Sequence, residues 1–397
     1  MRPLPRRASV LLVLPVLALT ALTAPSSAAV GKTTFTRWDT TRELATGTTS
    51  NAEVTNDAVY LARGTTATWT SPWHDLGYDA KTLVPSWRVS TRPGSYAVVK
   101  VRVRHGSTVG SWDNVARWAF NSDTLRRASS TSQTDDLAKL SVDTIVANSG
   151  KAFDGFQVKV ELHRTSTKVK APILGAVNVT AANFSTRNPS TSETTMTRTV
   201  DLDVPRSSQM VHRKHHTKYD GGGAAWCSPT SANMVMRYAG KGPSASTYAW
   251  TKEKEGYVDH AARYSYDWRY EGTGNWAFTA AYAGEYGADA FVTRLMSLRD
   301  AEAFIKAGIP LVASIAFGKG QLSGAPLTST PGHMVVIRGF TSTGAVIVND
   351  PAASSNSTVR RTYSRAQFEK AWQNGGGGIV YVIRSRSTDL PADTARW

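Results

Sequence analysis

The chain has 397 residues, which at roughly 100–200 residues per domain predicts two domains, each able to bury its own core. Its single cysteine excludes an intramolecular disulfide, and it excludes zinc and iron–sulfur sites built from several thiolates. The 46 lysines and arginines outnumber the 30 aspartates and glutamates, but no run of five or six like charges occurs, so we expect no nucleic-acid partner.

Residues 1–29 have the three parts of a secretory signal peptide. Three arginines make residues 2–7 basic, residues 10–22 are apolar, and residues 25–29 resemble a small-residue cleavage site. The apolar segment is shorter than the about 20 residues that a membrane-spanning helix needs, and no later segment is long enough. We therefore expect a secreted, extracellular protein without a membrane span.

Residues 31–185 have the pattern of an all-β sandwich. Short alternating runs of apolar and polar residues are separated by Pro-Gly, Gly-Ser and Asn-Ser-Gly turns. The expected strands are 54–61, 66–73, 84–90, 97–105, 116–121, 140–146, 156–163 and 173–179. The tryptophans of this half are expected to fill its core, with a carbohydrate-binding face as the alternative: Trp69, Trp73, Trp87, Trp112 and Trp118.

A segment rich in Ser, Thr and Asn, residues 186–199, is the predicted linker to an α+β domain of residues 200–385, with residues 386–397 as a tail. Pro229 suits the first turn of a helix, and Ser297 with Asp300 forms a capping-box pattern. The expected helices are 229–238, 275–286 and 297–306. The expected strands are 311–317, 334–340, 345–349 and 379–383.

The glycine-rich segment 221–226 delivers Cys227 to the predicted start of the 229–238 helix. The thiolate is the reactive form of cysteine, and the partial positive charge at a helix N-terminus favours it. The N–H groups of the same first turn can stabilise an oxyanion. Cys227 is therefore the predicted nucleophile, and the alternative is a buried, inert thiol.

His333 stands at the entrance to the predicted strand 334–340, and Asp350 at the exit of the strand 345–349. If residues 341–344 form a hairpin loop that pairs Phe340 with Ala345, Asp350 becomes the diagonal neighbour of His333 on one face of the sheet. A carboxylate that accepts from one ring nitrogen leaves the other nitrogen free to take the thiol proton.

Together these motifs resemble the papain-like cysteine peptidases of family 39, the bacteriocin-leader-processing peptidases and their secreted stand-alone relatives. The resemblance extends over residues 202–383. It implies a papain-like fold, with Cys227 as nucleophile, His333 as general base and then acid, and Asp350 as the orienting residue. Two departures occur: Ser228 follows the cysteine where the family usually has Gly, and no Gln lies in residues 221–226 to complete an oxyanion hole. The nearest upstream glutamine is Gln209, which we carry as the candidate, with an exposed loop amide as the alternative.

His212, His215 and His216 form the densest group of histidines. Arg213 and Lys214 lie inside the group and no carboxylate stands at ligand spacing, so we expect no metal. Asp259 and His260 form no recognisable pattern.

The sequence thus predicts a secreted cysteine peptidase or amidase that needs no cofactor and acts on a peptide or protein substrate through an acyl-enzyme intermediate. An acyl or peptidyl transferase on the same triad is one alternative. A non-catalytic protein that binds the cell surface or a polysaccharide is another, and the first half is the part expected to make such contacts.

Overall fold

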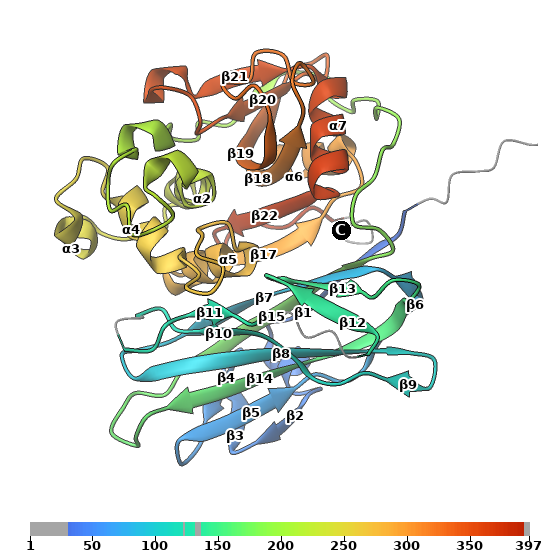
Figure 1. Ribbon diagram of the computed structural model, residues 1–397, viewed down its shortest axis with the longest axis vertical. Helices are drawn as coiled ribbons and strands as arrows, with labels where there is room; N and C mark the ends of the chain where they lie inside the picture. The colour runs from blue at the N-terminus through green and yellow to red at the C-terminus, as the bar shows by residue number, and fades with distance from the viewer. Residues whose placement is uncertain (1–30, 122–123, 132–135, 393–397) are drawn as a thin grey trace, which may run out of the picture. The chain divides into compact units, whose positions relative to one another are not determined.

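The computed structural model in Figure 1 describes residues 31–121, 124–131 and 136–392. The predicted signal peptide, residues 1–29, lies outside them, as do the last five residues of the predicted tail. Among the residues that are described, no helix combines the length and the apolar character needed to cross a bilayer.

In its described residues, the N-terminal region is mainly β-structure, with two antiparallel sheets and one short helix, α1 (Thr41–Leu44). The first sheet has the order β12 (Ala138–Ser141), β13 (Thr144–Ala147), β7 (Thr82–Ser90), β15 (Ile173–Ala182), β4 (Ala58–Leu61) and β3 (Ala52–Thr55), with β1 (Thr33–Trp38) also on β15. The second has the order β11 (Ala128–Ser129), β10 (Asp113–Trp118), β8 (Ser95–His105), β14 (Phe153–Arg164), β5 (Thr66–Thr70) and β2 (Thr48–Ser50), with β6 (His74–Ala80) on β14 and β9 (Thr108–Val109) on β8.

Alternation along the strands builds the core of this region. In β8, every second residue from Ser95 to Val103 is buried, while the residues between them remain partly exposed. Three of the tryptophans lie in the core, as expected: Trp69, Trp87 and Trp118. The other two, Trp73 and Trp112, are half-buried, and the guanidinium of Arg102 lies 5.0 and 4.6 Å from their ring centres.

Two of the expected strands are hairpins instead. The run 54–61 turns at Asn56 and Asp57, which both have positive φ and so suit a tight turn between β3 and β4. The run 140–146 turns between Ser141 and Thr144, with Val142 at a φ of 56°. A valine gives no turn signal, because its β-branched side chain is disfavoured in the left-handed region.

The C-terminal region combines a third antiparallel sheet with helices. The order of this sheet is β17 (Asp289–Arg294), β22 (Ile379–Arg384), β18 (Leu311–Phe317), β19 (Thr330–Phe340), β20 (Val346–Asn349) and β21 (Arg360–Tyr363), with β16 (Val200–Asp201) on β19. The helices are α2 (Cys227–Tyr238), α3 (Ala245–Tyr248), α4 (Tyr257–Ser265), α5 (Trp276–Glu285), α6 (Leu298–Lys306) and α7 (Arg365–Gly376). Four 3-10 turns, η1 (Gln209–His212), η2 (Gly223–Ala225), η3 (Ala249–Thr251) and η4 (Asn356–Thr358), complete the described part.

The local signals of the C-terminal region gave accurate boundaries. Ser297 and Asp300 form the predicted capping box of α6. Asn275 caps α5 by accepting a hydrogen bond from the N–H of Phe278. The helix α2 begins at Cys227, two residues before the predicted start.

Buried hydrogen bonds join the two regions and hold the segment between them. Arg127 is fully buried and donates to the carbonyls of Ala119 and Phe120 in one region and of Arg263 and Tyr266 in the other. Burial, only partly offset by nearby groups, lowers the pKa of Arg127 to about 9. In the predicted linker, the N–H groups of Ser192 and Thr195 donate to the carboxylates of Glu369 and Glu302, both at 2.7 Å. This segment is therefore fixed along the C-terminal region over at least four residues, and the boundaries at 186 and 199 stay a prediction.

Candidate active site

Cys227 is the first residue of α2 and is half-buried. The turn η2 and the buried Trp226 lead into it, and the indole N–H of Trp226 donates to the carbonyl of Tyr219 at 2.7 Å. The helix is fixed on the sheet because the Ser231 hydroxyl donates to the carbonyl of Met334 in β19 at 2.9 Å. The first N–H groups of a helix have no hydrogen-bond partner within it.

Ser228, the residue that departs from the family pattern, points into the protein. Its hydroxyl lies 3.0 Å from the hydroxyls of Thr279 in α5 and Tyr381 in β22. The serine therefore has two buried hydroxyls to bond with and ties the start of α2 to two neighbouring elements.

Two glycines in the approach to Cys227, Gly222 and Gly223, leave no room for a side chain. Gly222 has a φ of 95°, and a Cβ atom on Gly223 would collide with the backbone of Gln209 and His212 in η1. We expect Gly223→Ala to displace the turn before Cys227, to lower stability by about 1–3 kcal/mol, and to slow alkylation of the thiol. Urea unfolding and iodoacetamide labelling measure the two effects. Gly221→Ala is the control for a positive-φ glycine in open space, and equal effects of both variants would contradict the packing argument.

His333 lies close to the start of β19. Near the turn, the register in which β19 pairs with β20 differs from the predicted one. Phe340 pairs with Val346 rather than with Ala345, and a bulge between Ile337 and Gly339 then restores the predicted alignment from Ile337 onward. The extra residue is Arg338, whose buried guanidinium donates to Asp201 at 2.6 Å and to Asn349 at 3.2 Å. On the side of the bulge that contains His333, β19 and β20 are thus aligned as predicted.

His333 and Asp350 form a buried pair. The ring Nε2 of His333 lies 2.8 Å from Oδ1 of Asp350, and the two side chains are 3% and 2% exposed. Asp350 also accepts a hydrogen bond from the hydroxyl of Tyr363 at 2.8 Å and one from the N–H of Ala352 at 3.1 Å. The carboxylate is therefore held from three sides, and it fixes the plane of the imidazole ring.

The pair favours the charged forms of both residues. Burial by itself lowers the pKa of His333, but the charge and hydrogen bond of Asp350, followed by those of Cys227, outweigh it and raise this pKa to about 10. Burial likewise raises the pKa of Asp350, but the charge of His333 and the hydrogen bonds from His333 and Tyr363 lower it below its ordinary value. The charge and the hydrogen bonds of the pair thus favour an imidazolium against a carboxylate, and the sulfur of Cys227 lies within hydrogen-bonding reach of the same ring.

The thiol and the imidazole open into one cleft of about 330 Å³. Its wall combines aromatic and apolar side chains with the β12–β13 turn of the N-terminal region; the lining includes Tyr270, Trp276, Pro331, Met334 and residues 141–144. A neighbouring hollow of about 450 Å³ shares Pro331 and Gly375 with it. The two hollows therefore adjoin each other at these two residues.

Sequence reasoning missed the turn that borders this cleft. Asp143 is buried, and its carboxylate accepts a hydrogen bond from the N–H of Trp276, the first residue of α5, at 2.6 Å. Burial raises the pKa of Asp143 to about 6. Tyr363, the second partner of Asp350, was also missed. No local pattern marks either residue, because Tyr363 reaches the site through strand pairing and Asp143 through a contact with a residue far along the chain.

Gln209 lies against the turn that leads into Cys227. Its side-chain amide donates to the carbonyl of Ala224 at 2.6 Å, and its Oε1 atom is buried with no hydrogen-bond partner among the residues described. It is 4% exposed, so the alternative of an exposed loop amide is wrong. The described lining of the cleft does not include it, and its role at the oxyanion stays a prediction.

A half-buried thiol at the start of a helix, within reach of an imidazole held by a carboxylate, is the arrangement of a thiol hydrolase. The sequence matches the Peptidase C39 like family over residues 201–380 and the Peptidase C39 N-terminal domain over residues 34–182. These two ranges take in most of the chain, which belongs to the C39-like peptidases. No curated protein matches it.

Among solved structures, the chain is similar to the crystal structure of a protein described as a C39-like peptidase from Bacillus anthracis. The identity is 18% and the TM-score 0.32, and the match covers 48% of this chain and 100% of the other.

Proposed function

We propose that the chain is a secreted cysteine peptidase or amidase in which Cys227, His333 and Asp350 form the catalytic triad. The observation that carries this proposal is the buried His333–Asp350 pair beside the thiol. An imidazolium fixed in this position favours the thiolate of Cys227, because opposite charges at close range stabilise each other. We further propose that the two N-terminal sheets form a β-sandwich and that the C-terminal region is papain-like.

The reaction we propose has two halves. In the first, the Cys227 sulfur attacks the carbonyl carbon of the substrate, and the proton of His333 passes to the leaving amine as the C–N bond breaks. In the second, His333 takes a proton from water, whose oxygen attacks the carbonyl carbon of the thioester; the C–S bond then breaks and releases the carboxylic acid and the thiolate of Cys227. The proton then remains on His333, which restores the starting charge pair.

The oxyanion formed in each half needs donors that face the carbonyl oxygen. The N–H groups at the start of α2 supply the first of these, since they lie beside the sulfur and have no partner within the helix. Gln209 is the second candidate, because one of its two amide hydrogens is used on Ala224 and the other is available.

The cleft supports a peptide as the substrate. Its aromatic and apolar wall suits side chains of a polypeptide, and the neighbouring hollow provides room for residues farther along an extended chain.

The test uses the full chain without residues 1–29 and a pool of peptides of mixed sequence. We expect cleavage products by mass spectrometry that disappear when the thiol is alkylated and when Cys227 is replaced by serine. Products that carry an added amine in place of water would identify a transferase. If no peptide is cleaved and Cys227 is labelled no faster than an ordinary thiol, the result would favour the alternative of a non-catalytic binding protein. Export is tested separately by N-terminal sequencing of protein from culture medium, which should begin near residue 30.

A further inference from the structure

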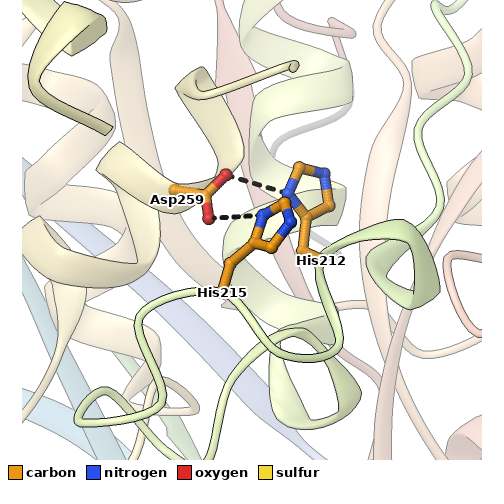
Figure 2. A group of neighbouring side chains, drawn as sticks. All are labelled: His212, His215 and Asp259. Carbon is orange, nitrogen blue, oxygen red and sulfur yellow. Dashed lines mark hydrogen bonds and ion pairs between the residues drawn. The ribbon is translucent and has the colours of Figure 1, made fainter. Parts of the chain in front are cut away.

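A second cluster of polar side chains lies in the C-terminal region, outside the proposed catalytic triad. Figure 2 shows His212 and His215 with their rings directed toward the carboxylate of Asp259. The Nδ1 atom of His212 lies 2.8 Å from Oδ2, and the Nδ1 atom of His215 lies 3.1 Å from Oδ1. His212 and Asp259 are fully buried, whereas the side chain of His215 is 23% exposed.

The structure removes both sequence arguments against a metal at these histidines. Arg213 and Lys214 are exposed, whereas the rings of His212 and His215 point inward to α4. The missing carboxylate is supplied by Asp259, which the fold brings from a distant part of the sequence. One ligand atom from each of the three residues lies within 4.8 Å of the other two. This spacing suits donors around a single ion after a small contraction or expansion.

Hydrogen bonding alone satisfies the cluster poorly when His215 is neutral, whereas a protonated His215 would donate to both neighbouring carboxylates. The two ring nitrogens of His215 each face a carboxylate, Asp259 at 3.1 Å and Glu253 at 3.2 Å, so a neutral ring would turn a lone pair toward one of them. The Nε2 atom of His212 is buried and has no hydrogen-bond partner in the described part of the chain. A metal ion on the Nδ1 atoms relieves the first conflict, because a neutral His215 then coordinates with Nδ1 and donates Nε2–H to Glu253. A carboxylate behind the second nitrogen is a common support for metal-binding histidines.

We propose that His212, His215 and Asp259 bind one divalent metal ion of the zinc class. Two imidazoles and a carboxylate favour zinc and its neighbours in the first transition series over magnesium or calcium, which prefer oxygen ligands. A hollow of about 210 Å³ lined by His215, Glu253 and Asn356 gives the ion a path from solvent and leaves room for a water molecule as the fourth ligand.

The ion would have a structural role. It would join η1 to α4, and the ring of His212 lies 6.3 Å from that of Trp226, the residue before Cys227. Binding would therefore hold the turn that presents the thiol. The proposal does not depend on the catalytic role of Cys227.

The experiment uses the full chain without residues 1–29 and with Cys227→Ser, so that the thiol cannot contribute a ligand. The protein is stripped with EDTA and titrated with Zn²⁺ by calorimetry and with Co²⁺ by visible absorption. We expect one ion per chain, a tetrahedral Co²⁺ spectrum and a higher Tm with Zn²⁺. Glu253→Gln should weaken binding by about 10–100-fold.

His215→Gln is the decisive variant, because this side chain is partly exposed and its loss should leave the fold intact. Binding should disappear in His215→Gln and in Asp259→Asn. The control is His105→Gln, which alters the exposed group of Asp79, His105 and Asp154 and should leave binding unchanged. Absence of stoichiometric binding, or binding that survives in a folded His215→Gln variant, would overturn the proposal.

Discussion

Replacing His333 with glutamine is expected to lower kcat/KM about 1,000-fold or more on any peptide that the chain cleaves. The imidazole is the only group in the proposed triad that can both stabilise the thiolate and protonate the leaving amine, and such groups act as a unit with the nucleophile. Glutamine keeps a polar side chain of similar reach but carries no proton that titrates. The same variant should slow alkylation of Cys227 at about pH 6, where an ordinary thiol is almost fully protonated.

Peptide cleavage and iodoacetamide labelling measured from pH 5 to pH 9 test this expectation. The control is His105→Gln, which removes a partly exposed histidine of the N-terminal region and should change neither rate. If His333→Gln alkylates as fast as the parent chain at low pH, His333 does not activate the thiol, and the proposed triad fails.

Removing the carboxylate of Asp350 is expected to have the largest effect on stability. In Asp350→Ala, the buried His333 loses its charge partner and the hydroxyl of Tyr363 loses its acceptor. Breaking a buried ion pair on one side costs about 3–5 kcal/mol, because the remaining group is left desolvated. Activity should fall with it, since the ring is no longer oriented.

Asp350→Asn separates the charge from the shape of this residue. The amide oxygen can still accept from Nε2 of His333, so we expect a smaller loss of stability than in the alanine variant. The negative charge is gone, however, so the pKa of His333 should fall from its raised value of about 10.

The pH dependence of stability follows from the direction of these two shifts. The pKa of His333 is raised above its ordinary 6.5, so its contribution is complete below about pH 6.5 and is lost as the pH rises through about 10. The pKa of Asp350 is lowered from 3.8, so its contribution is complete above that value and is lost as the pH falls further. Urea unfolding should therefore show an alkaline loss of stability that begins at lower pH in Asp350→Asn. An identical alkaline profile in both proteins would contradict the paired state.

Local signals explain which elements the sequence could predict. The capping box fixes α6, and the run 311–317, which is apolar except for Ser314, matches β18. The strand β17 was missed because it begins with Asp289 and ends with Arg294, which are buried only through distant partners. The helix α4 was missed because no side chain caps its start and its buried residues include the polar Asp259 and His260.

The residues of the candidate site likewise fall into those that the sequence could predict and those that it could not. Cys227, His333 and Asp350 could be found because each stands beside a recognisable boundary of a helix or strand. The hydroxyl of Tyr363 and the inward direction of Ser228 could not be found, because strand pairing and helix packing set them. The carboxylate of Asp259 reaches the histidines only in the folded chain, so sequence spacing hid that cluster.

The turn between β12 and β13 makes one wall of the cleft depend on the N-terminal region. Val142 holds a left-handed conformation that costs a β-branched residue about 1–3 kcal/mol, and the surrounding fold must maintain it. The turn belongs to the N-terminal region but borders the cleft that contains the thiol. A shortened protein without that region would keep the three candidate residues yet lose one wall of the cleft that we propose as the substrate site. The two regions are therefore expected to be inherited together, and exchange of the first between relatives should alter which peptides are cut.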